Sequence, residues 1–166
     1  SLANPTCSSI TEKEVRSLLP PKRPKESHKY SFGRLQLVAG SSKYPGAARL
    51  CALGAFKAGC GYVSLETTAP IEVLREMPEV VLGFFPKSDA FVIGPGIDDI
   101  QNLQIAELVA KVPVEKPLLF DGTVLKHFSD FNLKGRRIVL TPHEMEFSQI
   151  LGKDWPLERI KANRVG

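Results

Sequence analysis

Short apolar runs alternate along this chain with amphipathic stretches of helical length. Six runs predict buried strands because they are short, rich in branched and aromatic residues, and bounded by turn residues; they cover residues 35–39, 62–66, 80–85, 90–93, 118–121 and 138–140. Helices are predicted between them at residues 10–19, 47–58, 71–77, 100–111 and 124–128. This strict alternation predicts an α/β fold with a mainly parallel sheet, whose crossover helices cover its faces.

Three predicted strands end in a turn of small residues that leads into a helix-like segment, at residues 35–47, 91–98 and 138–146. Carboxyl ends of parallel strands share one edge of a sheet, where α/β proteins bind ligands. In the first turn, Gly40 and Gly46 allow unusual φ angles and close approach of a ligand. A phosphate or similar anion at the following helix start is the expected guest, and an ordinary tight turn is the alternative.

The second turn is Gly94-Pro95-Gly96. Two glycines around a proline give a stiff turn with accessible N–H groups, and because a structural turn needs only one glycine, the second favours a ligand-facing wall. Asp121 ends another strand at the same edge. Its carboxylate is suited to act on a substrate hydroxyl or a metal ion, although Asp-Gly is also a common turn.

The third turn predicts a capped helix. Thr141 suits the N-cap, Pro142 the first helical position, and Glu144 the third position of a capping box. Capping does not explain His143, which is expected to project from the strand end, where a neutral imidazole would hydrogen-bond a substrate amide or hydroxyl. A helix-start histidine without a role is the alternative.

Composition narrows the function classes. The 166 residues are 43% hydrophobic, enough for one core, and no apolar run or leader pattern predicts a membrane segment. Three cysteines without a Cys-x-x-Cys pair argue against a disulfide framework and a zinc site, so a reducing, cytoplasmic setting is expected. The net charge of +4 lies partly in a Pro/Lys stretch at residues 20–25, which reads as a solvated arm rather than a nucleic-acid site. Residues 1–9 are expected to be a flexible end, and residues 10–166 one domain.

Several motifs, taken in order, resemble the ADP/ATP-dependent NAD(P)H-hydrate dehydratase family, the YjeF-type carbohydrate-kinase-like domain of the ribokinase-like superfamily. They are residues 28–35, 39–41, 46–48, 58–61, 94–96 and 140–147, with Asp121. The resemblance implies a three-layer fold and repair of hydrated NADH or NADPH, in which ATP or ADP phosphorylates the hydroxyl and loss of phosphate restores the cofactor. It also implies a Mg²⁺-nucleotide, a homo-oligomer, and contact of Ala47, Gly96 and His143 with the hydrated dinucleotide.

The sequence departs from that family at several positions. Ala39 stands where a glycine is common, residues 97–99 lack a further glycine, and Thr123 replaces an acidic residue. The family's nucleotide loop and Gly-Thr-Gly-Asp motif, which carries the expected base, would lie beyond Gly166, and a helix-like end at residues 157–165 closes the chain. We therefore expect the last strands to be missing, the catalytic residue to be absent, and the chain alone to turn over little. A kinase for a small alcohol such as a vitamin precursor and a non-catalytic nucleotide-binding module are the alternatives.

Overall fold

A six-stranded parallel sheet forms the centre of the protein. The computed structural model describes residues 10–19, 24–98, 102–152 and 154–162. The strands are β1 (Arg34–Val38), β2 (Tyr62–Glu66), β3 (Val81–Leu82), β4 (Ala90–Ile93), β5 (Leu118–Phe120) and β6 (Ile138–Leu140). Their order is β3-β2-β1-β4-β5-β6, and every pairing is parallel. The predicted parallel sheet is confirmed, and its strand order reverses direction between β1 and β4, where such sheets form a ligand crevice.

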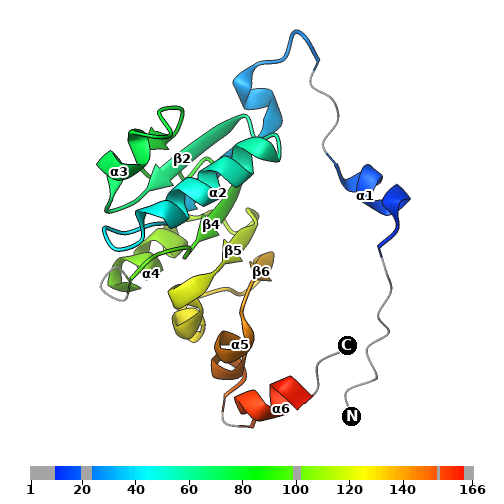
Figure 1. The fold of residues 1–166 in the computed structure, drawn as a ribbon, viewed down its shortest axis with the longest axis vertical. Coiled ribbons are helices and arrows are strands. Elements are labelled where there is room, and N and C mark those ends of the chain that lie inside the picture. Colours follow the sequence, from blue (N-terminus) through cyan, green and yellow to red (C-terminus); the bar gives the residue numbers. More distant parts are fainter. Residues whose placement is uncertain (1–9, 20–23, 99–101, 153, 163–166) are drawn as a thin grey trace.

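Helices cover both faces of the sheet, which gives three layers (Figure 1). One face carries α2 (Pro45–Lys57) and α3 (Pro70–Leu74), and the other carries α4 (Asn102–Lys111) and the 3₁₀ helix η3 (Gly122–Asp130). After β6 come α5 (Glu144–Leu151), which lies against η3, and α6 (Leu157–Ala162), which lies against α5. Before the sheet come α1 (Glu12–Leu18) and the 3₁₀ helix η1 (Lys29–Phe32).

The alternation of side chains along each strand divides the core in two. In β1, Leu37 points to the side of α2 and α3, while Val38 points to the side of α4 and η3. Likewise Ile93 of β4 is buried on the α4 side, whereas Val92 packs toward α2. The strand and helix patterns of the sequence therefore produce two separate apolar layers, one on each face of the sheet.

The strand predicted at residues 80–85 is too long, because β3 contains only two residues. The backbone after β3 instead hydrogen-bonds to a buried side chain, that of Gln36. Gln36 Nε2 donates to the carbonyl of Gly83 (3.1 Å), and its Oε1 accepts from the N–H of Phe85 (2.7 Å) and from Ser64 Oγ (2.7 Å). Gly83 also has a φ of +116°, which turns the chain out of the strand.

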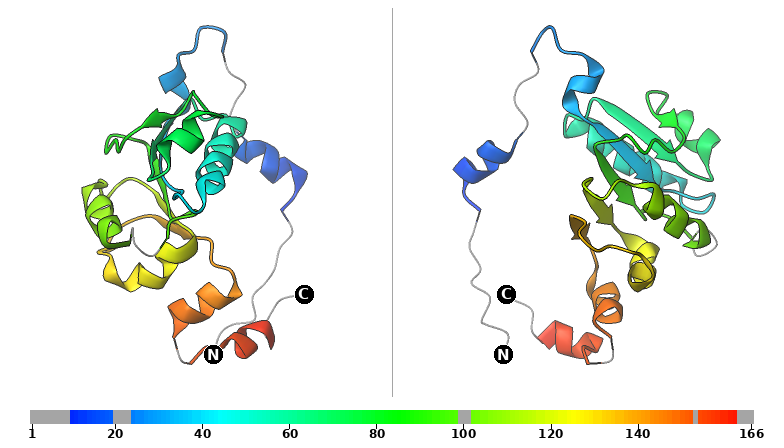
Figure 2. Two further views of the ribbon diagram at one scale, coloured as in Figure 1. Left: turned by 60° about the vertical axis from the view of Figure 1, so that its left-hand side comes forward. Right: turned by 180° about the vertical axis from the view of Figure 1, so that it is seen from behind.

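The predicted helices are found with shifted ends. The segment at 124–128 is the longer 3₁₀ helix η3, and residues 100 and 101 of the predicted 100–111 helix lie outside the described residues. The capping box of α1 is formed by Thr11 and Glu14, and α1 lies apart from the sheet (Figure 2). Residues 1–9 and 20–23, assigned above to a flexible end and an arm, also fall outside the description, as do 163–166. No helix among the described residues is long and apolar enough to cross a membrane.

A cluster of charges ties the start of β1 to the start of β4. Asp89 Oδ2 accepts from the backbone N–H of Arg34 (3.0 Å) and lies 3.4 Å from its Nε, while Lys116 Nζ lies 3.3 Å from Oδ1. The hydrogen bond from the Arg34 side chain lowers the pKa of Asp89, and its other bonds to Arg34 and Lys116 act in the same direction, against a smaller opposing effect of burial.

We expect Asp89→Asn to lower the free energy of unfolding by about 1 kcal/mol or less at neutral pH, since the carboxylate is partly solvated. Because the folded pKa lies below the unfolded one, this stabilisation is present above the unfolded pKa and is lost as the pH falls through the folded pKa. Urea unfolding of both proteins from pH 7 to pH 3 measures the difference, which should shrink with falling pH. Asp154→Asn, at an exposed aspartate, is the control; a constant difference for Asp89→Asn would contradict the assignment.

Candidate functional site

The turns after β1, β4 and β5 meet at the carboxyl edge of the sheet through backbone contacts. The N–H of Gly40 donates to the carbonyl of Pro95 at 2.7 Å, which joins the first turn to the second. Gly94 has a φ of +127°, and a side-chain carbon there would overlap the carbonyl of Asp121. The second turn therefore packs directly on the backbone of the turn after β5.

The second turn also lies against the start of α2. Gly96 has a φ of +69°, and a side-chain carbon there would lie 2.5 Å from Ala47 Cβ and 3.1 Å from the carbonyl oxygen of Tyr44. A side-chain carbon on Gly40 would similarly lie 2.7 Å from Ala48 Cβ. Five of the predicted site residues are thus brought together at one edge: Gly40, Ala47, Gly94, Gly96 and Asp121.

Protein packing requires glycine at positions 94 and 96, apart from any contact with a ligand. The sequence favoured a ligand wall for the paired glycines because one glycine is enough for a turn. In the structure both are required by the close approach of protein atoms, Gly94 by Asp121 and Gly96 by Ala47. Their contact with a ligand stays a prediction, whereas their role in joining the turns is a property of the fold.

Gly46 lies apart from this group. It lines a groove between α2 and α3 together with Leu50, Leu53 and Met77, and an ion pair between Arg49 and Glu76 lies there. Nothing lies within 4 Å of the position that a side chain on Gly46 would take. A glycine one residue before Ala47 therefore faces a different surface, because successive residues of a helix point in different directions.

Asp121 is held by the turn after β6. Thr141 Oγ1 donates to Asp121 Oδ1 at 2.7 Å and lies 3.3 Å from the carbonyl oxygen of Phe120. The charge of the Asp121 carboxylate also acts on Cys51 of α2. Burial raises the pKa of the Cys51 thiol, and the Asp121 carboxylate raises it further. The carboxylate predicted from the sequence is thus held at the end of β6 by Thr141.

The predicted cap of α5 is wrong. Its N-cap is His143, whose Nδ1 accepts from the N–H groups of Met145 (3.2 Å) and Glu146 (3.3 Å). Glu146 Oε2 in turn accepts from the N–H of His143 at 2.9 Å, which completes a capping box two residues later than predicted. Thr141 does not cap the helix because its hydroxyl is bound to Asp121. Capping therefore does explain one nitrogen of His143.

His143 follows a different strand from those that carry the glycine turns. It follows β6, which is two strands away from β4 in the sheet, and its side chain is 65% exposed. Its Nε2 lies 3.4 Å from Glu146 Oε1. The imidazole is thus positioned by the start of α5, after the last strand of the sheet.

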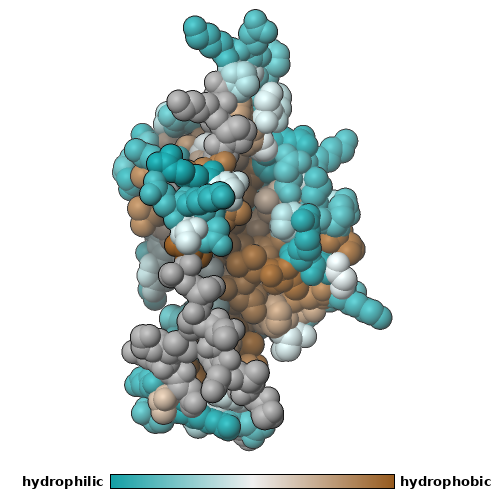
Figure 3. Space-filling view, turned by 90° about the vertical axis from the view of Figure 1, so that its right-hand side faces the viewer, coloured by the Kyte–Doolittle hydropathy of each residue, from teal (hydrophilic) through white to brown (hydrophobic). Residues whose placement is uncertain are grey.

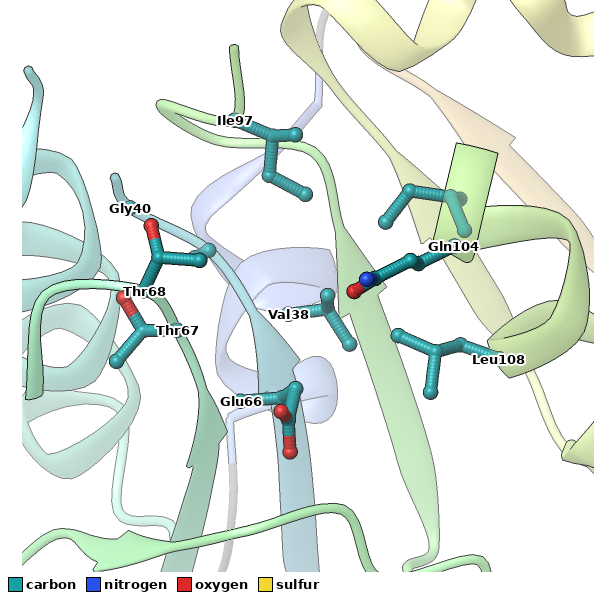
Figure 4. Close-up of a pocket in the computed structure, with 10 residues that line it drawn as sticks. Val38, Gly40, Glu66, Thr67, Thr68, Ile97, Gln104 and Leu108 are labelled. Carbon is teal, nitrogen blue, oxygen red and sulfur yellow. The ribbon is translucent and has the colours of Figure 1, made fainter. Parts of the chain in front are cut away.

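A hollow on the α4 side of the same edge was not predicted (Figure 4). The end of β2 and the residues after it contribute Glu66, Thr67 and Thr68, and α4 contributes Gln104, whose amide is directed toward Val38 in the close-up. The signal was available in the sequence, because the residues after β2 must lie at the same edge as those after β1. It was missed because that turn has no glycine motif.

Comparison with known proteins decides the family. A family model described as NAD(P)H-hydrate dehydratase, of the carbohydrate-kinase type, matches residues 35–163. The chain belongs to the NAD(P)H-hydrate dehydratase family. The matched stretch begins in β1 and ends beyond α6, so it includes every turn of the carboxyl edge.

Individual relatives agree with this. The chain is 34% identical to a bifunctional NAD(P)H-hydrate repair enzyme of Thermofilum pendens over 89% of its own length. The crystal structure of the ADP/ATP-dependent NAD(P)H-hydrate dehydratase of Bacillus subtilis, co-crystallised with ATP/Mg²⁺, superposes with a TM-score of 0.75 and 28% identity over 92% of this chain. A ribokinase-like superfamily protein of Enterococcus faecalis superposes with a TM-score of 0.72 and 25% identity over 83% of this chain. The predicted ribokinase-like fold is confirmed.

The chain spans only part of the length of these relatives. It covers 32% of the length of the Thermofilum repair enzyme, 58% of the Bacillus chain and 54% of the Enterococcus chain.

The packing at the carboxyl edge predicts opposite effects for one substitution at two glycines. Gly94→Ala should lower the free energy of unfolding by about 3 kcal/mol or more, because the methyl group meets the Asp121 backbone at a positive φ. Gly54→Ala, at an open position in α2, should raise it by about 0.5–1 kcal/mol. Urea unfolding followed by circular dichroism measures both, and equal effects would contradict the described contact.

Proposed function

We propose that the whole protein repairs hydrated NADH or NADPH, dehydrating it at the expense of ADP or ATP, and that this chain supplies the wall that binds the hydrated dinucleotide. Membership of the dehydratase family supports the reaction. The observation that carries the assignment to this edge is the contact between Gly96 and Ala47, because two positions assigned to the substrate by resemblance are neighbours in space.

The start of α2 is the expected place for the negative part of the substrate. A dinucleotide carries a pyrophosphate, and the positive end of a helix dipole attracts such a group. α2 is thirteen residues long, begins at Pro45 and has no acidic residue in its first turn. Ala47 lies in that turn, so a pyrophosphate beside Ala47 and Gly96 would meet no opposing charge from α2.

His143 is suited to bind an oxygen of the substrate. Its Nδ1 accepts two backbone N–H groups, so in the neutral imidazole the hydrogen is on Nε2. This nitrogen is a donor on an exposed side chain, and because Glu146 Oε1 lies 3.4 Å from it, a substrate oxygen would share the donor with that carboxylate or replace it. The helix cap therefore sets the tautomer that a hydroxyl or carboxamide oxygen of hydrated nicotinamide requires.

ATP or ADP and Mg²⁺ are part of the proposal for the whole protein, as the ATP/Mg²⁺ co-crystals of the Bacillus relative suggest. The described residues do not fit a magnesium site of their own, since no three His, Cys, Asp or Glu side chains among them lie close enough to hold a metal ion. We therefore assign neither the ion nor the nucleotide to residues of this chain, and no step of the reaction is derived through them.

Calorimetric titration of the 166-residue protein with hydrated NADH tests the proposed wall. His143→Ser should weaken binding about fivefold, since serine preserves the N-cap while one hydrogen bond of about 1 kcal/mol to the ligand is lost. His127→Ser, at a half-buried histidine on η3, should leave the affinity unchanged.

Two outcomes would contradict this assignment. Binding of hydrated NADH that is equally strong in His143→Ser would remove His143 from the wall. Failure to bind hydrated NADH, together with binding of a small alcohol, would favour a kinase of the same superfamily. Conversion of hydrated NADH to NADH by the whole protein with ADP or ATP, followed by the absorbance of NADH, tests the reaction separately.

A further inference from the structure

Three aromatic side chains gather at the amino edge of the sheet, where the strands begin. Tyr30 belongs to η1, Tyr62 is the first residue of β2, and Phe85 lies in the loop between β3 and β4. The ring centroids of Tyr30 and Tyr62 are 5.5 Å apart, and the ring of Phe85 meets that of Tyr62 edge-on at 6.5 Å. We call these three residues the aromatic cluster. It lies at the opposite end of the strands from the glycine turns.

The rings of the aromatic cluster are not part of a core. None of the three belongs to either buried apolar layer, and Tyr30 is 57% exposed and Phe85 40%. Apolar side chains are also exposed in the area seen from the β6 side of the molecule, with hydrophilic ones on its flanks (Figure 3). The aromatic cluster is the more informative surface, because exposed rings offer both apolar contact and a preferred geometry for another flat ring.

A cation lies beside two of the rings. Lys29 Nζ is 5.1 Å from the centroid of the Tyr30 ring and 5.5 Å from that of the Tyr62 ring. At both distances the face of a ring attracts an ammonium group. No ion pair of the described residues includes Lys29, so its positive charge is not neutralised by a carboxylate there.

The aromatic cluster borders a hollow in the surface. The hollow has a volume of about 350 Å³ and is lined by Tyr30, Arg34, Tyr62, Phe85, Lys87 and Ser88. Binding sites for small molecules typically have volumes of about 300–1,000 Å³ and combine an apolar or aromatic lining with a few polar groups. These lining residues, all within the described part of the chain, include two cations and no carboxylate. The hollow is therefore suited to a ligand that has a flat ring and a negative charge.

Asp89 follows this lining in the sequence, and its carboxylate is already paired. Its Oδ2 lies 3.4 Å from Arg34 Nε, and its Oδ1 lies 3.3 Å from Lys116 Nζ. These three groups together carry one net positive charge. Lys87 adds another, because it is exposed and forms no ion pair within the part of the chain that the structure describes. The surroundings of the hollow are thus positive and attract an anion.

We propose that this hollow binds a free mononucleotide, whose base stacks on the aromatic cluster and whose phosphate is attracted by Arg34 and Lys87. A nucleotide combines the two features that the lining favours, a flat ring and a negative charge. Aromatic side chains stack on bases with little preference among them, because every base has a π face. Guanidinium and ammonium groups form charge-assisted hydrogen bonds with phosphate.

The size of the hollow favours a free nucleotide over a nucleic-acid strand, because sites for single strands follow several successive nucleotides along a groove. The proposal goes beyond the proposed function and does not depend on it. A nucleotide in the hollow would lie at the other end of the strands from Ala47 and Gly96, and would leave the carboxyl edge open to the substrate.

Calorimetric titration of the 166-residue protein with AMP tests the proposal. Tyr30→Ala should weaken AMP binding about fivefold or more, because a stacking surface is lost. Lys87→Ala should weaken AMP binding about threefold, since one attractive charge is removed. It should leave the binding of adenosine unchanged, because adenosine has no phosphate. Lys87→Ala removes no ring contact, so it tests the hollow even where the loss of Tyr30 disturbs η1.

The chain offers a matched control for each variant. Tyr44→Ala removes a tyrosine of similar exposure, 47%, whose ring centroid lies 5.1 Å from Lys43 Nζ at the carboxyl edge. Lys126→Ala removes an exposed lysine of η3. Both controls should leave AMP binding unchanged. Circular dichroism checks that each variant keeps the thermal unfolding midpoint of the wild type.

Three results would overturn the proposal. The first is no binding of AMP to the wild-type protein. The second is AMP binding that Tyr30→Ala and Lys87→Ala leave unchanged, which would place AMP elsewhere, and at the carboxyl edge if Tyr44→Ala weakens it. The third is much tighter binding of a short oligoadenylate than of AMP, which would mean that the hollow belongs to a nucleic-acid surface. None of these results involves hydrated NADH or turnover, so they are distinguishable from failure of the proposed function.

Discussion

Contact between backbones, without intervening side chains, holds the carboxyl edge of this sheet together. Gly94 lies against the Asp121 backbone, and Gly40 donates from its N–H to Pro95, each at a φ that favours glycine. The turns after β1, β4 and β5 are therefore fixed within backbone distance of one another. The positions of Ala47 and of the Asp121 carboxylate follow from this constraint, because Ala47 lies in the first turn of α2 and Asp121 directly follows β5.

The sequence predicted the elements well where the local pattern alone decides them. The strands at 62–66, 90–93 and 138–140 have the predicted bounds, because apolar runs between turn residues are a local signal. β3 was predicted too long for a non-local reason. Its continuation is bound by Gln36, which is 47 residues away from Gly83 in the sequence, and a local pattern contains no information on such a partner.

The same distinction between local patterns and non-local partners applies to the candidate site. The sequence predicted the edge because turn motifs after parallel strands must share it. It could not place individual side chains. Glu144 follows Thr141 by three residues and Glu146 follows His143 by the same spacing, yet only the first pair was predicted to form a capping box, because threonine is the more usual cap. The contact of Thr141 with Asp121, twenty residues earlier, decided between them, and it moved the helix start to His143.

The hydrogen bond between Thr141 and Asp121 also lies next to an exposed part of the sheet. Thr141 is exposed, so its hydrogen bond to Asp121 is now made in the presence of water. Burial of the exposed Val139 would exclude that water, because its side chain lies on the same face of the sheet two residues before Thr141. A hydrogen bond to a carboxylate becomes stronger as the surrounding dielectric falls. Such burial would therefore fix the orientation of Asp121 at the edge where the substrate is expected.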